Sequence, residues 1–279
     1  MVQKENSDDV IDVAPDADGS AGGGEIAFDV GGGAAPPTEG QMPMFYEKPT
    51  LLRAEDHGDL AFSGVSDYGF AREVNSVPLN GVEFPLAQRT YPVVFSDDDS
   101  CFPVAILGLR QNRNLFVDAA GQWERGAYVP AYVRRYPFIF FADEKQENFA
   151  LCFDAASKFI GTTGTKFFED GKPTDLTQNA LRFCSEFQGH YQNTVAMCAA
   201  LKEQNLLISN RADIRLRAGG TLSVGNFRIV DENRLQVLPK DVVMSWWEKG
   251  WLAFIYAHLM SLATWAGLGD RLAEEEDTQ

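Results

Sequence analysis

The residues best suited to chemistry are three histidines, His57, His190 and His258, and four cysteines, Cys101, Cys152, Cys184 and Cys198. A Ser-His-Asp hydrolase of the G-x-S-x-G type presents its serine on a tight turn, and that motif is absent from the sequence. No cysteine pair has C-x-x-C spacing, and His190 has one carboxylate at helical spacing, Glu186. We therefore expect no catalytic set, no metal site and no cofactor, and we expect the thiols to be buried and reduced.

A group of arginine and aromatic residues is the more informative feature. Arg134 and Arg135 lie between Tyr132 and Tyr136, downstream of Trp123 and Tyr128. Arginine in aromatic surroundings is typical of sites that recognise carboxylates or protein partners, but such arginines also pair with surface acids. Our candidate partner-binding residues are Trp123, Tyr128, Tyr132, Arg134, Arg135, Tyr136, Tyr256 and His258.

The charge of the chain restricts its partners. Its 279 residues carry a net charge of −16, with no basic cluster, which argues against nucleic acid and against stable insertion into an anionic membrane. Residues 1–42 hold nine acids and one base (1 − 9 = −8) and are rich in glycine, so we expect a disordered tail there. No basic segment followed by an apolar one begins the chain, and we expect a cytoplasmic protein.

The pattern of apolar and polar residues predicts a single α+β domain over residues 43–269, followed by an acidic frayed tail at 270–279. About five short strands between Tyr68 and Asp154 should form an antiparallel meander, with a hairpin pairing 103–109 with 115–117. Residues 174–206 repeat apolar side chains at helical spacing and predict one long helix. A pair of C-terminal helices should begin near Pro239. We therefore expect a fold in which an antiparallel sheet packs against the long helix and this helix pair.

The stretch from Gly250 to Gly269 has no formal charge and is about as long as a membrane span. It contains His258, Ser261 and Thr264, and no basic cluster flanks it. We therefore expect a buried core helix.

A series of short motifs in a fixed order resembles the SapC family, bacterial proteins named for a link to surface-layer protein transport. The motifs that carry the resemblance are 45–49 (FYEKP), 74–79 (VNSVPL), 83–85 (EFP), 91–95 (YPVVF), 115–118 (LFVD), 128–131 (YVPA), 134–138 (RRYPF), 227–232, 250–252 (GWL) and 255–259 (IYAHL), with Trp123. The resemblance implies an accessory role in handling surface proteins and carries over no catalytic residue or cofactor.

Two hypotheses from different classes follow. The first is a non-enzymatic accessory protein that binds a protein or peptide partner through the Arg134–Arg135 group. The alternative is an enzyme acting on a peptide or protein substrate, with His258 or His190 in a pocket. A structural subunit that dimerises through the long helix is a third reading, and the sequence leaves the oligomeric state open.

Overall fold

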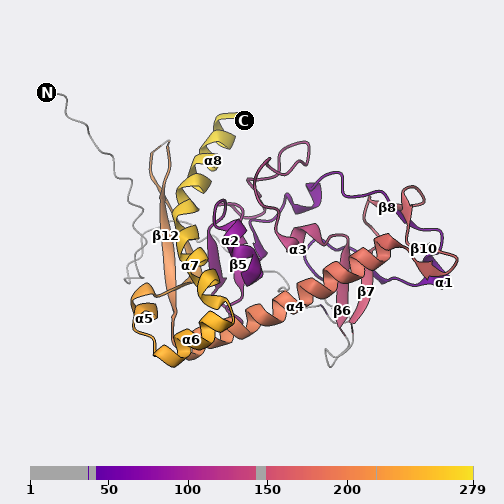
Figure 1. Cartoon of the computed structure of the whole chain (residues 1–279). Helices are drawn as coiled ribbons and strands as arrows, with labels where there is room; N and C mark the ends of the chain where they lie inside the picture. The colour runs from indigo at the N-terminus through magenta and orange to yellow at the C-terminus, as the bar shows by residue number, and fades with distance from the viewer. Residues whose placement is uncertain (1–36, 38–41, 143–148, 218, 279) are drawn as a thin grey trace.

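The computed structural model describes residues 37, 42–142, 149–217 and 219–278 (Figure 1). Helices and antiparallel sheets are both present, which confirms the predicted α+β class. The predicted N-terminal tail lies almost wholly outside these residues.

The larger sheet has five strands in the order β12-β13-β4-β5-β3, and every neighbouring pair is antiparallel. Its members are β3 (Ser76–Pro78), β4 (Val93–Ser96), β5 (Pro103–Ile106), β12 (Leu207–Arg215) and β13 (Thr221–Val230). Both faces of β4 and β5 are buried. This region therefore contains the main hydrophobic core, which includes helices from the C-terminal part of the chain.

The second region has a three-stranded sheet in the order β1-β7-β6, formed by Pro49–Leu51, Phe149–Asp154 and Phe138–Ala142. Very short strands extend this region: β2 (Ala61–Phe62), β8 (Ile160–Gly161), β9 (Thr165–Lys166), β10 (Phe168–Glu169) and β11 (Lys172–Pro173). Five strands, β3 to β7, lie between Tyr68 and Asp154, as many as predicted, but they belong to two sheets rather than one meander, and the predicted strand at 115–117 is not among them.

The predicted hairpin between 103–109 and 115–117 is wrong. Both edges of β5 are already occupied, by β3 and by β4, and the β4–β5 hairpin turns through the acidic residues 97–99. A Cβ on Gly108 would lie 1.8 Å from the Arg113 carbonyl oxygen, so the chain folds back tightly at this point. Residues 115–117 continue into a loop that makes one isolated bridge, from Val117 to Trp123.

The long helix α4 (Asp175–Glu203) confirms the strongest helical prediction and runs along both sheet regions (Figure 1). Its first half buries Ala180 and Cys184 against the cluster around the smaller sheet. Its last turns bury Met197 and Leu201 in the main core. The helix therefore connects the two packing regions.

Shorter helical segments are α1 (Ala54–His57), η1 (Gly69–Ala71), η2 (Gly81–Glu83), α2 (Phe84–Ala87), α3 (Ala131–Arg134) and α5 (Glu232–Gln236).

The C-terminal helices are α6 (Lys240–Glu248), α7 (Trp251–Ser261), η3 (Leu262–Thr264) and α8 (Trp265–Thr278). Gly250, at φ 74°, divides α6 from α7, and this left-handed conformation favours glycine. Residues 270–278 were expected to form a frayed tail, but they continue α8 because Leu272 and Ala273 are buried in the protein.

The continuous helix Trp251–Glu276 is long and apolar enough to cross a membrane by length and composition, a test that the core helices of soluble proteins also pass. It packs against β4, β12 and β13, and Trp265 and His258 on it are fully buried. This packing agrees with the predicted core helix. All four cysteines are buried and free, as predicted.

Candidate functional site

Arg134 ends the single turn of α3 and Arg135 follows it directly, and the two side chains lie in different environments. Successive residues of a helix point about 100° apart. Arg134 is exposed, whereas Arg135 is 5% exposed and faces α4. The predicted arginine pair is therefore two sites rather than one patch.

A buried carboxylate, Glu83, fixes the segment that carries α3. Its Oε1 accepts hydrogen bonds from the Tyr128 hydroxyl (2.9 Å) and the Ala131 amide (2.6 Å), and its Oε2 accepts one from the Asn80 amide (3.0 Å). Burial raises the pKa of Glu83. We did not predict this role, although the spacing Asn80-x-x-Glu83 is the pattern of a helix capping box and could have indicated it.

The Arg134 guanidinium is held in one orientation at the surface. Its Nε donates to the Val129 carbonyl oxygen (3.0 Å) and its Nη2 donates to the Tyr128 hydroxyl (3.1 Å). The Tyr128 and Phe183 rings flank it, with centroids 5.7 and 5.4 Å from Cζ. Across the described residues, no carboxylate forms an ion pair with Arg134.

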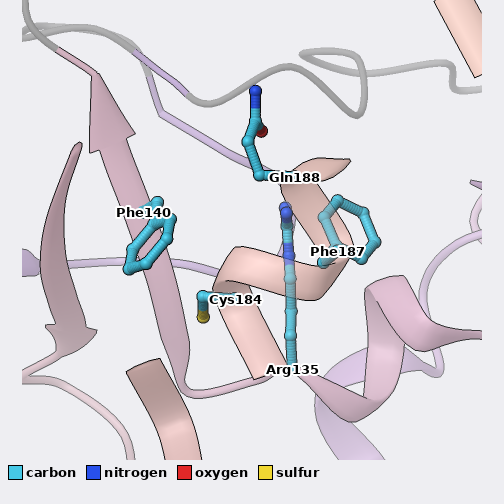
Figure 2. Close-up of a pocket in the computed structure, with 5 residues that line it drawn as sticks. All are labelled: Arg135, Phe140, Cys184, Phe187 and Gln188. Carbon is cyan, nitrogen blue, oxygen red and sulfur yellow. The ribbon is translucent and has the colours of Figure 1, made fainter. Parts of the chain in front are cut away.

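The Arg135 guanidinium lies against two aromatic rings, with Cζ 4.0 Å from the centroid of Tyr132 and 4.7 Å from that of Phe187. A cavity of about 10 Å³ adjoins it, lined by Arg135, Phe140, Cys184, Phe187 and Gln188. Figure 2 shows Arg135 extended between Cys184 and Phe187, with its nitrogen atoms at the Gln188 end.

The two tyrosines beside the arginines have structural roles. Tyr132 is fully buried beneath Arg135. Tyr136 stacks on Phe70 with ring centroids 4.2 Å apart, and its hydroxyl donates to Asp154 Oδ2 (3.0 Å). Burial raises the pKa of Tyr136 to about 12, so its hydroxyl stays protonated at neutral pH.

Trp123 is buried and connects to the same segment through Tyr91. Its Nε1–H donates to the Tyr91 hydroxyl (3.1 Å), which donates to the Tyr128 carbonyl oxygen (2.5 Å). Trp123 also borders an open groove of about 660 Å³, which lies between residues 113–125 and the α8 residues Arg271 and Glu275. Within this groove Arg271 forms an ion pair with Glu124.

His258 and Tyr256 lie apart from the arginines. His258 is fully buried on α7, where its Nε2 accepts from the Val230 amide (3.1 Å). Its Nδ1 therefore carries the proton and donates to the Val93 carbonyl oxygen (2.7 Å). Burial lowers the pKa of His258 to about 4. His258 thus joins β4 to β13, and it shares no contact with Arg134 or Arg135 in the described part of the chain.

Two further candidates, Tyr256 and His190, have surface positions. Tyr256 is 47% exposed on α7, and His190 is exposed on α4. Within the described ranges, no group of three or more His, Cys, Asp or Glu side chains could hold a metal ion. The residues predicted from the sequence therefore divide among an exposed arginine, a buried arginine and a buried histidine, rather than converging on one cavity.

Comparisons with known proteins give one assignment. No curated protein and no solved structure matches the chain. The SapC family model matches residues 52–268, which is most of the chain. The chain belongs to the SapC family.

Proposed function

We propose that this protein is a non-enzymatic accessory protein that binds an acidic segment of a protein partner through Arg134, in the handling of surface-layer or other surface proteins. The observation that carries this proposal is the oriented, exposed Arg134 guanidinium without a carboxylate partner among the described residues. Membership of the SapC family, bacterial proteins named for a link to surface-layer protein transport, supports the connection to surface proteins.

The chemistry of Arg134 suits a carboxylate ligand. A guanidinium has five N–H donors, and the two bonds to Val129 and Tyr128 leave three for a partner. Its planar fork matches a carboxylate with two parallel hydrogen bonds. The flanking Tyr128 and Phe183 rings and the Glu83 bond to Tyr128 reduce the side-chain freedom that binding would otherwise remove.

Affinity capture from a lysate of the organism that encodes the protein tests this proposal. We compare the parent chain with Arg134→Ala and with a matched control, Arg182→Ala, which removes an exposed arginine of α4 that bonds to Asn179. Capture at about 150 mM salt screens the net negative charge beyond about 8 Å. We expect Arg134→Ala to lose a partner that the parent and Arg182→Ala both retain. Identical partner sets for all three proteins would contradict the proposal.

A strain that lacks the protein tests the link to surface proteins. We expect surface proteins to accumulate inside the cells of that strain, and we expect the parent gene, but not the Arg134→Ala form, to restore their export. Normal surface protein levels in the deletion strain would refute this part of the proposal.

A further inference from the structure

The cavity between α3 and α4 is lined by hydrogen-bond donors that have no acceptor. Arg135 Nε, Arg135 Nη2 and Gln188 Nε2 are buried, and within the described chain none of them has a hydrogen-bond partner. Buried donors are normally satisfied, and leaving them unpaired is costly. Because these unpaired atoms all donate, the missing partner is an acceptor.

No carboxylate among the described residues offsets the positive charge of Arg135. Arginine stays protonated in proteins, and this side chain is 95% buried (5% exposed). Burial raises the pKa of the neighbouring Cys184 thiol to about 12, so the thiol is neutral at pH 7 and supplies no negative charge.

We propose that this cavity binds one small monovalent anion, such as chloride, through the N–H groups of Arg135 and Gln188. A volume of about 10 Å³ admits a single atom of about the size of a water molecule. A neutral water could accept the hydrogen bonds but would supply no negative charge beside the buried guanidinium, whereas the charge of Arg135 would repel a cation. The site faces α4 rather than the exposed Arg134 surface, so this inference does not depend on the proposed function.

Thermal unfolding of the full chain at constant ionic strength tests the inference, with sodium gluconate, chloride or formate as the salt. A ligand that binds only the folded state raises Tm. At tenfold above its Kd, we expect chloride to raise the Tm of the parent by about 3–6 °C relative to gluconate, which is too large for the cavity.

Two variants connect the effect to this cavity. Arg135→Met removes the charge and keeps an unbranched side chain, so its Tm should not respond to chloride. Gln188→Glu keeps the side-chain shape and supplies an internal carboxylate beside Arg135. Gln188→Glu should therefore have a higher Tm than the parent in gluconate, and its Tm should not respond to chloride. This variant still tests the inference if Arg135→Met does not fold.

The outcomes separate the possible occupants. Formate has three heavy atoms and should stabilise the parent less than chloride does, whereas equal stabilisation by the two salts would show that anions act elsewhere on the protein and would overturn the inference. A parent Tm that is the same in all three salts would overturn the inference, because a water would then occupy the cavity. An unchanged response to chloride in Gln188→Glu would also overturn it.

Discussion

Acidification should weaken the fold through one side chain, His258. The unfolded chain binds a proton on this imidazole with a pKa of about 6.5, whereas burial lowers the folded pKa to about 4. In the folded state the added proton must bind Nε2, the atom that accepts the hydrogen bond from the Val230 amide, so protonation breaks that bond. The unfolded state therefore binds the proton first as the pH falls.

The size of the effect follows from the difference between the two pKa values. A depressed folded pKa contributes stability that is fully present above about pH 6.5 and is lost as the pH falls towards 4. At 1.36 kcal/mol per pKa unit, the difference amounts to about 3 kcal/mol. Glu83 changes the stability in the opposite direction. Its pKa is raised in the folded state, so the stability that it contributes is lost as the pH rises through the folded pKa.

Urea denaturation between pH 4 and pH 7 measures this contribution, with the parent compared with His258→Phe and His190→Gln. Subtracting the His258→Phe curve from the parent curve removes the shared Glu83 contribution. His258→Phe should lower the free energy of unfolding at pH 7 by about 2–5 kcal/mol, since the Val230 amide and the Val93 carbonyl lose their partner. The exposed control, His190→Gln, should keep the pH dependence of the parent. A parent-minus-His258→Phe difference that is flat across this pH range would refute the reasoning.

Two further substitutions test the parts that position the site. Glu83→Gln leaves an amide where three groups donate to a carboxylate, so we expect a loss of about 1–3 kcal/mol in urea denaturation and weaker partner capture. Unchanged stability would show that Glu83 does not anchor α3. Gly108→Ala places a Cβ against the Arg113 carbonyl oxygen, so we expect it to lower the free energy of unfolding by at least about 2 kcal/mol. The control is Gly189→Ala on α4, whose added Cβ meets no atom within 4 Å and should not destabilise the protein. Equal stability of the two alanine variants would contradict this packing.

Local sequence patterns predicted the elements that depend on neighbouring residues. The long helix α4 and the C-terminal helix pair that begins near Pro239 both follow from nearby side chains. Gly225 and Asn226 are residue types that are common in turns, but they lie within β13. Arg211 faces both of them, so the turn-forming residues make a β-bulge instead.

The candidate site depends on contacts between distant residues, which one sequence does not reveal. Glu83 fixes Ala131 from 48 positions away, and this contact sets the direction in which each arginine points. His258 meets Val93 from 165 positions away and Val230 from 28, so its burial depends on how β4 and β13 pair. Residue types therefore indicated the arginine and histidine candidates, but not that they would separate.

Site-directed photo-cross-linking tests the central claim most directly. A photoreactive benzoyl-phenylalanine at position 183 replaces the ring that flanks Arg134, and the same group at position 237, where Val237 is 79% exposed, serves as the control. We predict that position 183 forms an adduct with an acid-rich segment of a partner, that position 237 does not, and that Arg134→Ala abolishes the adduct. An adduct of equal yield in the Arg134→Ala background would contradict recognition through this arginine.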